Sequence, residues 1–394
     1  MTTEQQIQQL LTRGVENIFP NTEFLEKELR SGRKLTLYTG YDPTAPTLHV
    51  GHGITMLKLR DFQQLGHKII FLIGDFTGMI GDPTDKTSAR QKLTREQVVE
   101  NCTLYQAQAK IILDFGGDNP VEVKYNSEWL AKMSFGDVVE LASHFTVQRM
   151  MERDMFQKRL EEEKPIYLHE FLYPLMQGYD SVAMNVDGEV GGNDQTFNML
   201  AGRTLMKDLK QKEKFVIAGK LLTDNSGKKM GKTEGNMIAF SDTPEDMFGK
   251  VMRWTDGMIV SGFELCTRIP MDEVRQIESE LAGGQNPRDA KLRLAFEITR
   301  MFLGEDAAKQ GQSHFEIVIQ SKDKPDEIPE LKPSDLKIIT VLVEAGFVSS
   351  NSEARQNIAG GGVRVNDEKV EDVNFELKAG DVVQKGKRFF VRIM

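Results

Sequence analysis

Cysteine is scarce in this chain, with two among 394 residues, Cys102 and Cys266. So few cysteines argue against a disulfide scaffold and suit a reducing compartment, where thiols stay free. No apolar run reaches the roughly 18 residues of a membrane-spanning helix, and the first six residues, 1–6, are polar. We therefore expect a cytoplasmic protein without a signal peptide, a membrane segment or a membrane partner.

Two further features that the sequence lacks narrow the classes of protein to which this chain could belong. The sequence has no Gly-x-Gly-x-x-Gly fingerprint, which disfavours nicotinamide cofactors. It also lacks an excess of basic residues, because 50 Lys and Arg against 59 Asp and Glu give a formal net charge of −9. That balance argues against a surface coated with nucleic-acid-binding charge, although RNA phosphates need only a local basic face.

The hydrophobic pattern predicts several domains. From residue 34 to about 220, apolar strands such as Lys68–Ile73 alternate with amphipathic helices such as residues 96–105, which predicts a parallel sheet with crossover helices. Ligands bind such sheets at the carboxyl ends of the strands. Before this region, residues 1–32 are expected to form a helical lead-in. The apolar residues at helical spacing there are Ile7, Leu10, Leu11 and Val15.

The residue pattern changes twice in the remainder of the chain. Residues 241–320 are mainly helical in pattern, and residues 321–332 are charged and broken by proline, as in a linker. Residues 333–394 form a short module, in which a helix over 352–359 leads through three glycines to strand-like Val363–Val365. We expect domains at 1–220, 221–320 and 333–394.

The first motif with chemical meaning is His49-Val50-Gly51-His52. It follows an apolar run and a turn-rich stretch and leads into a helix over 54–60, so free backbone N–H groups and the helix dipole favour an anion there. Both imidazoles can donate to phosphate oxygens, and Gly51 lets an adenine or a ribose approach. A lone histidine would more simply be a capping residue, and a zinc site lacks further ligands nearby.

The second motif is Lys229-Met230-Gly231-Lys232-Thr233, far downstream. Its lysines and neighbouring glycines predict an electropositive loop that could stabilise charge on a leaving pyrophosphate. Taken alone, a solvated basic surface loop is the simpler interpretation.

Together the two motifs resemble the signatures of class I aminoacyl-tRNA synthetases, and the text between them resembles the bacterial tyrosyl-tRNA synthetases over essentially the whole chain. The matching stretches are Tyr38–Thr44, Thr77–Pro83, Tyr173–Asp180 and Gly191–Gln195. The resemblance implies a Rossmann-like parallel-sheet catalytic domain, an α-helical anticodon-binding domain and a small α+β RNA-binding domain of the S4 kind. It also implies a homodimer, with an inserted dimerisation and acceptor-stem region at about 130–170.

The implied reaction activates L-tyrosine with ATP and Mg²⁺, with no metal held by the protein, and then transfers tyrosine to the 3′-terminal adenosine of tRNA(Tyr). Activation needs alignment and charge stabilisation rather than a general base, because the substrate carboxylate is itself the nucleophile. A pocket built to bind the phenolic hydroxyl rejects phenylalanine by about 10⁴–10⁵. The tyrosine-binding residues implied by the resemblance are Tyr38 and Asp180 at the hydroxyl, Asp82, Tyr173 and Gln177 at the ammonium group, Gln195 at the carboxylate, and Thr77 as a further residue of the site.

The resemblance also implies nucleotide and RNA contacts. Candidates for ATP binding are Asp42, His49, Gly51, His52, Thr55, Gly192, Asp194 and Lys232. Candidates for catalysis at the phosphates are Thr44, His49, His52, Lys86, Arg90, Lys229, Lys232 and Thr233. Candidates for tRNA contacts are His144, Arg149, Arg153, Arg355, Arg364, Lys369, Lys385, Lys387 and Arg388.

Two positions depart from the family pattern. Gly231 stands where serine is commoner, and Thr196-Phe197 stand where many tyrosine enzymes have a tryptophan. Singly, Asp82 could be a turn initiator and Tyr173 a core residue.

Three rival functions are less favoured. Asp180 paired with Tyr38, and the S4-like module, argue against a tryptophanyl enzyme of the same fold. The expected ligands are all present, which argues against a non-catalytic RNA-binding protein, and an unrelated adenylyltransferase predicts a much shorter chain.

Overall fold

The computed structural model describes residues 2–82, 93–223, 237–321, 328–386 and 389–394. It divides into two compact units, residues 1–312 and residues 313–394, and the boundary falls within helix α17, Glu305–Ser321. Each unit has its own sheet.

The sheet of the first unit has six strands in the order β1-β6-β5-β2-β3-β4. Five of them are parallel, and β1 lies antiparallel to β6 at one edge. The strands are β1 Val15–Phe19, β2 Thr36–Tyr41, β3 Lys68–Ile73, β4 Glu122–Tyr125, β5 Gly188–Gly192 and β6 Phe215–Gly219. The predicted parallel sheet is thus confirmed, and the apolar run of β3 is buried along its length from Ile69 onward.

The helical lead-in is only partly correct. Helix α1, Thr3–Thr12, and helix α2, Thr22–Arg30, are present, but Val15 belongs to strand β1. Gly14, at a φ of 63°, reverses the chain after α1. The helical spacing of Val15 was therefore coincidental, because a left-handed residue ended the helix before it.

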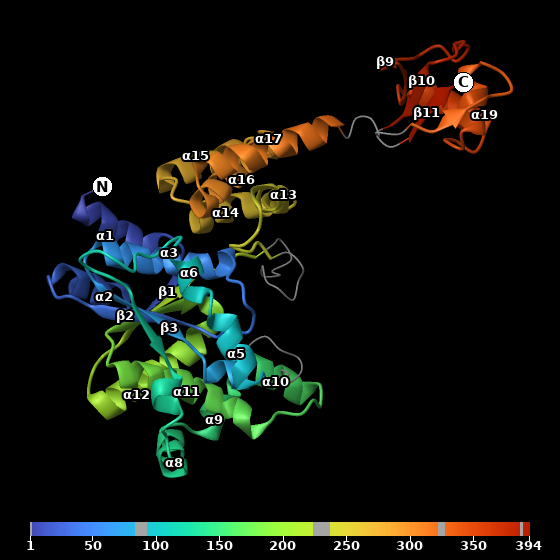
Figure 1. The fold of residues 1–394 in the computed structure, drawn as a ribbon. Coiled ribbons are helices and arrows are strands. Elements are labelled where there is room, and N and C mark those ends of the chain that lie inside the picture. Colours follow the sequence, from blue (N-terminus) through green and yellow to red (C-terminus); the bar gives the residue numbers. More distant parts are fainter. Residues whose placement is uncertain (1, 83–92, 224–236, 322–327, 387–388) are drawn as a thin grey trace. The chain divides into compact units, whose positions relative to one another are not determined.

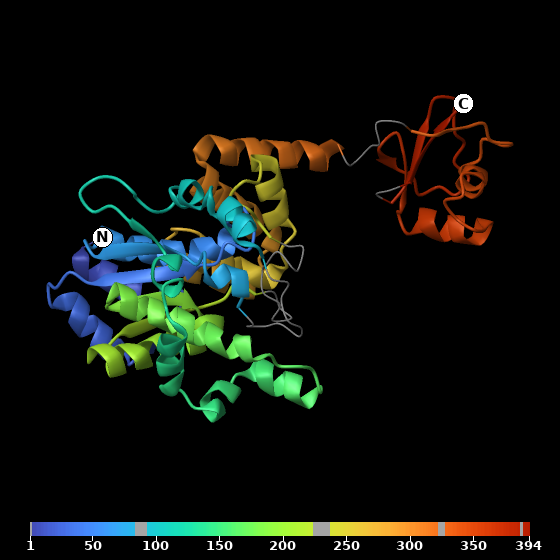
Figure 2. The ribbon, with the colours of Figure 1, turned by 60° about the horizontal axis from the view of Figure 1, so that its bottom comes forward.

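Helices cover both faces of this sheet (Figures 1 and 2). Helix α3, Val50–Gln64, packs on β2, β3 and β5, while α11, Leu168–Met184, and α12, Thr196–Lys210, lie together on the other face. The arrangement follows from handedness: β2 to β3 and β5 to β6 run in opposite directions across the sheet, and right-handed crossovers then place their helices on opposite faces. The shorter helices are α4 Thr77–Ile80, α5 Arg95–Cys102, α6 Tyr105–Ala109, α7 Ser127–Leu130, α8 Phe135–Ser143, α9 Val147–Met151 and α10 Asp154–Glu161.

The predicted helical region completes the first unit. Helix α14 packs on α3 as well as on α15 and α16. The helices here are α13 Pro244–Met252, α14 Ile259–Cys266, α15 Met271–Ala282, α16 Pro287–Leu303 and the start of α17. Arg13 joins this region to the end of α1, since its guanidinium donates to the carbonyl oxygens of Phe263, Glu264, Thr267 and Ile269.

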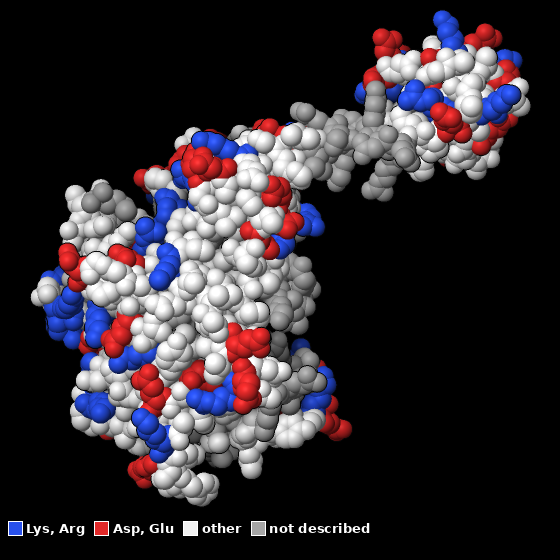
Figure 3. Space-filling view, viewed as in Figure 1, with Lys and Arg blue, Asp and Glu red and all other residues white. Residues whose placement is uncertain are grey.

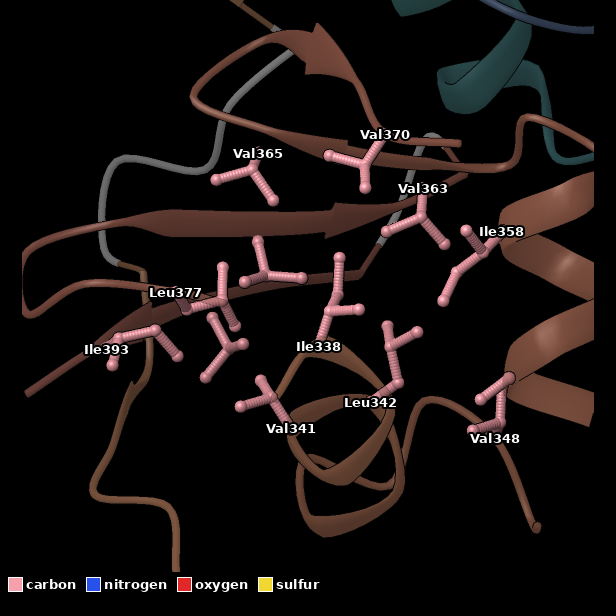
Figure 4. Packing of buried hydrophobic residues seen from close by; sticks show 13 residues of the cluster. Ile338, Val341, Leu342, Val348, Ile358, Val363, Val365, Val370, Leu377 and Ile393 are labelled. Atoms are coloured by element: carbon pink, nitrogen blue, oxygen red, sulfur yellow. The ribbon is translucent and has the colours of Figure 1, made fainter. Parts of the chain in front are cut away.

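The second unit is a small α+β module with the strand order β7-β11-β10-β8-β9. Its elements are β7 Glu330–Leu331, α18 Ile338–Glu344, α19 Asn351–Ala359, β8 Val363–Val365, β9 Glu368–Lys369, β10 Val382–Lys385 and β11 Phe389–Ile393. Branched aliphatic side chains from α18, α19 and the strands meet in one core (Figure 4), in which Ile338, Leu342 and Val363 are fully buried.

Charge on the surface is mixed in sign. On the face drawn in Figure 3, basic and acidic side chains are interspersed over both units, in keeping with the net charge of −9. None of the helices in the described part of the chain combines the length and the hydrophobicity needed to cross a membrane.

Candidate active site

The candidate residues gather where the strand order reverses. Strands β2 and β5 are neighbours, with β3 beyond one and β6 beyond the other. The chain leaves β2 at Tyr41, just before Asp42, and leaves β5 at Gly192, just before Asp194. Both exits lie at the carboxyl edge of the sheet, which is the position predicted from the alternating pattern.

The histidine motif forms the start of α3. His49 is the N-cap residue, and its backbone N–H donates to His52 Nδ1 across 3.1 Å. The two rings stack with centroids 3.8 Å apart, and a Cβ on Gly51 would lie 2.9 Å from the His49 ring, so the glycine makes this packing possible. Burial lowers the pKa of His49 to about 4 and that of His52 well below its ordinary value. Two neutral imidazoles therefore stand at a helix N-terminus, where an anion is favoured.

His49 Nδ1 is buried and has no hydrogen-bond partner among the described residues. A buried polar nitrogen of this kind is costly unless a ligand or water satisfies it. Nearby, the Thr55 hydroxyl donates to the His52 carbonyl oxygen across 2.9 Å and lies 2.8 Å from the Tyr41 hydroxyl.

The second motif, with Lys229, Lys232 and Thr233, falls within residues 224–236 and lies outside the described residues. The chain that follows the motif is described, and it pairs with the start of α3: Val50 N–H donates to Ile238 O across 2.9 Å, and Phe240 N–H donates to Leu48 O across 3.0 Å. These two hydrogen bonds place residues 238–240, which follow the second motif in the chain, beside the start of α3.

Lys86 and Arg90, within residues 83–92, and Lys387 and Arg388 also lie outside the described residues.

Asp180 and Tyr38 form the deepest part of the site. Asp180, on α11, is 3% exposed, and its carboxylate accepts from Trp129 Nε1 at 2.7 Å and from Asn126 Nδ2 at 3.3 Å. Burial raises the pKa of Asp180 well above its ordinary value, and the two donors oppose that rise. Tyr38, on β2, is fully buried, and its hydroxyl lies 2.9 Å from Ser181 Oγ.

The expected ammonium ligands are engaged with other side chains of the site. Gln195 Nε2 donates to Asp82 Oδ2 across 2.7 Å, which joins the expected carboxylate ligand to an expected ammonium ligand. Gln177 Nε2 donates to Glu189 Oε1 across 3.1 Å. A bound amino acid would replace part of this network with its own charged groups.

Asp42 connects the expected tyrosine and nucleotide sites. Its carboxylate accepts from the Tyr173 hydroxyl at 2.8 Å and from the Thr77 hydroxyl at 2.6 Å, and its carbonyl oxygen accepts from Thr44 N–H at 2.8 Å. The loop after β2 is therefore held against α11 and α4.

The expected RNA contacts in the first unit differ in exposure. Arg149 is exposed, and His144 Nδ1 lies 3.2 Å from Asp208. Arg153 is 6% exposed, its guanidinium lies 3.7 Å from Asp82 and stacks near Phe197, and burial lowers its pKa. The structure thus places Arg153 beside Asp82 and Phe197, with little of its side chain at the surface.

The second unit presents part of its expected basic set. Arg355 is exposed on α19, and Arg364 on β8 stands opposite Lys369 on β9. The Lys369 ammonium binds the Glu371 carboxylate at 2.8 Å, so its charge is already partly balanced. Lys385 is less available, because its ammonium binds Phe347 O and lies 3.9 Å from Glu353.

Sequence reasoning missed several buried polar residues around the pocket. Asn126 and Trp129 follow β4 and hold Asp180, while Ser181, Glu189 and Lys214 form a connected group behind Tyr38. The available signal was a charge within a short apolar strand, as at Glu189 between Gly188 and Val190. No group of three or more His, Cys, Asp or Glu residues in the described part is placed to hold a metal ion.

The protein families and the individual proteins that this chain resembles agree with one another. Residues 30–320 match the family described as tRNA synthetases class I (W and Y), and residues 336–383 match the S4 domain. A tyrosine–tRNA ligase of Thermotoga maritima is 45% identical over 100% of this chain and 98% of its own length. One of Haemophilus influenzae is 45% identical over 97% of this chain and 95% of its own.

Solved structures agree on the fold. A C-terminally truncated mitochondrial tyrosyl-tRNA synthetase of Aspergillus nidulans matches with a TM-score of 0.67 and 21% identity, over 79% of this chain and 94% of that one. A tyrosyl-tRNA synthetase of Archaeoglobus fulgidus, complexed with L-tyrosine, matches with a TM-score of 0.61 and 22% identity, over 79% of this chain and 99% of that one.

Proposed function

This chain belongs to the class I tyrosyl-tRNA synthetases, and on that premise we propose how its residues divide the work of joining tyrosine to tRNA. Tyr38 and Asp180 bind the phenolic hydroxyl at the bottom of the pocket. The observation that carries this assignment is the buried Asp180 carboxylate, oriented by Trp129 and Asn126. A buried acceptor of this kind loses a hydrogen bond when phenylalanine replaces tyrosine, and its desolvation then goes uncompensated.

The amino-acid end of tyrosine lies nearer the sheet edge. Asp82, Tyr173 and Gln177, with Thr77, bind the ammonium group, and Gln195 turns from Asp82 to the substrate carboxylate. This assignment is supported by the hydrogen bond between Gln195 and Asp82, since an ammonium ion is a stronger donor to Asp82 than an amide. Arg153, ion-paired with the same carboxylate, is reassigned from RNA contact to support of this subsite.

ATP binds across the start of α3 and the end of β5. The adenosine is held by Asp42, Gly51, His52, Thr55, Gly192 and Asp194. His49 and Thr44 bind the phosphates together with Lys86, Arg90, Lys229, Lys232 and Thr233. His49 suits this role because its Nδ1 is buried and its ring is neutral, so it can donate a hydrogen bond to an oxyanion without a charge of its own.

The chemistry then needs positioning more than acid–base catalysis. A carboxylate oxygen of tyrosine attacks the α-phosphorus of ATP, a new C–O–P linkage forms, and the bond to pyrophosphate breaks. Donors at the helix N-terminus stabilise charge as it develops on the phosphates. A hydroxyl of the 3′-terminal adenosine of tRNA then attacks the acyl carbon, and AMP leaves.

Mg²⁺ enters as the complex with ATP, with phosphate oxygens among its ligands, because Mg²⁺ is usually bound through substrate phosphates rather than by an all-protein cage. It supplies neutralisation of phosphate charge when bound.

The tRNA extends over further surfaces. The S4 domain binds RNA through Arg355, Arg364, Lys369, Lys385 and Arg388, while His144 and Arg149 contact the acceptor stem. The exposed side chains of Arg355 and Arg364 support this assignment, since RNA phosphates bind accessible cations.

The chain acts as a cytoplasmic homodimer through the region 130–170. That region carries large exposed apolar side chains, including Phe135 at 84%, Val147 at 71% and Leu168 at 85% exposure. A second copy would remove them from water.

The first test is amino-acid-dependent ATP–pyrophosphate exchange without tRNA, with tyrosine, phenylalanine and tryptophan side by side. We expect exchange with tyrosine alone, and loss of that preference in Asp180→Asn. Exchange with tryptophan would overturn the specificity and keep the fold, and no exchange with any of the three would contradict the proposed activation chemistry.

A further inference from the structure

A buried lysine lies behind Tyr38. Lys214, just before β6, has a side chain that is 0% exposed, and its ammonium lies 5.7 Å from the centre of the Tyr38 ring. It donates to Ser181 Oγ at 2.8 Å, to Met199 O at 3.2 Å and to the Glu189 carboxylate. These three acceptors use the three N–H donors of an ammonium group, so its orientation is fixed.

The surroundings are shaped for this ammonium. Glu189 on β5 is buried and supplies the opposite charge, which a buried cation requires. A Cβ on Gly202 of α12 would lie 2.6 Å from Lys214 Nζ and 2.8 Å from Ser181 Oγ. The glycine therefore leaves the space in which lysine and serine meet.

The direction of the hydrogen bonds among Lys214, Ser181 and Tyr38 follows from the number of protons that each group can donate. Because Ser181 Oγ accepts from Lys214, its single proton needs another acceptor, and the Tyr38 oxygen lies 2.9 Å away. When Ser181 donates to Tyr38, the Tyr38 proton is left to donate elsewhere, and the acceptors near it are Gln177 O at 3.5 Å and the Glu189 carboxylate, which the substrate oxygen would replace.

We propose that Lys214 and Ser181 are positioning residues that set Tyr38 as a hydrogen-bond donor to the phenolic oxygen of the substrate. This inference rests on the proposed tyrosine pocket. The substrate oxygen, once it accepts from Tyr38, directs its own proton to Asp180, so a relay from Lys214 through Ser181 and Tyr38 gives the substrate hydroxyl one preferred orientation. Burial raises the pKa of Tyr38 well above its ordinary value, so the phenol keeps the proton that it donates.

The test is Ser181→Ala in pyrophosphate exchange with tyrosine and with phenylalanine. We expect kcat/KM for tyrosine to fall about threefold to tenfold, mainly through KM, as for one weakened neutral hydrogen bond, while kcat/KM for phenylalanine stays constant. An equal fall for both amino acids would mean a purely structural role and would overturn the inference, as would no change for either.

A second variant removes the lysine without leaving an unpaired charge. In Lys214→Met/Glu189→Gln the ion pair is neutralised, and the glutamine can still accept from Gln177. We expect a similar loss of preference for tyrosine, and no further loss when Ser181→Ala is added, because Lys214 acts through Ser181. Additive losses would contradict the relay.

The matched control is Thr299→Val, which removes a buried hydroxyl that donates to Ala295 O at 2.8 Å in α16, away from the pocket. It should change Tm without changing the ratio of tyrosine to phenylalanine activity. Wild-type exchange with tyrosine separates the two ideas: if it is absent, the proposed function fails; if it is present but Ser181→Ala keeps the wild-type ratio, only the relay fails.

Discussion

The indole N–H of Trp129 donates to Asp180 Oδ1 across 2.7 Å, and that carboxylate is almost fully buried. Trp129→Phe removes the donor and keeps an aromatic ring. A hydrogen bond to a charged group contributes about 1.5–3 kcal/mol, so we expect kcat/KM for tyrosine to fall about tenfold or more. The loss should be measured by pyrophosphate exchange across a pH series.

The direction in which the activity of this variant changes with pH follows from the pKa of Asp180. Because the Trp129 hydrogen bond lowers the pKa of Asp180 against the effect of burial, its removal raises that pKa further. The variant should therefore recover activity with tyrosine as the pH rises. Recovery as the pH falls would contradict the ionised-acceptor role of Asp180.

The ion pair between Arg159 and Glu170 is buried, with side chains 2% and 4% exposed. Arg159→Met leaves Glu170 without its partner, so we expect a loss of about 3–5 kcal/mol in the free energy of unfolding. Arg159→Met/Glu170→Gln should recover much of it, as measured by urea unfolding. Arg149→Met is the control, because its pair with Glu152 is more than half exposed and should contribute less than about 1 kcal/mol. Equal losses in the buried single and double variants would argue against the charge explanation.

His49 and His52 should make the fold sensitive to acid. Their pKa values are lowered in the folded chain, that of His49 to about 4, whereas an unfolded histidine titrates near 6.5. The unfolded state then binds more protons between about pH 4 and 6.5, so the free energy of unfolding should decrease as the pH falls through this window. His49→Asn/His52→Asn should flatten that slope in chemical unfolding, while His314→Asn, at an exposed position, should leave it unchanged.

Phe135 on α8 is 84% exposed and tests the homodimer. Phe135→Asp should raise the dissociation constant of the dimer, seen as a lower molar mass by light scattering at equal concentration. Leu209→Asp introduces the same charge at an exposed apolar position of α12 and serves as the control. A monomeric wild-type chain, or a dimer indifferent to Phe135→Asp, would contradict the proposed interface.

What the sequence revealed depended on how local each signal was. The run of β3 and the period of α16 were predicted correctly because burial repeats within a few residues there. The edge strand β1 was missed because its pairing with β6, about 200 residues later in the chain, leaves no local pattern. Arg153 was expected to contact RNA, and its burial beside Asp82 and Phe197 could not be predicted because these neighbours come from other parts of the chain.

The residues around Tyr38 show more clearly that local sequence patterns do not reveal contacts between distant segments. Tyr38 and Asp180 were proposed from motifs, since each lies in a stretch that resembles the family. Lys214, Ser181 and Glu189 come from three separate segments, and their meaning depends on distances that only the folded chain defines. A lysine next to an apolar strand is usually interpreted from sequence as a solvated strand end, yet here the lysine is fully buried.

The short antiparallel pairing of Leu48 and Val50 with Ile238 and Phe240 has a kinetic consequence. On the proposed binding of phosphates at His49, residues 238–240 would tether the lysine motif, which precedes them in the chain, to the site, and the effective concentration of a tethered group depends on the length of the connecting chain. Lengthening the chain between Lys232 and Ala239 with glycine and serine should therefore slow adenylate formation while leaving the binding of tyrosine unaffected.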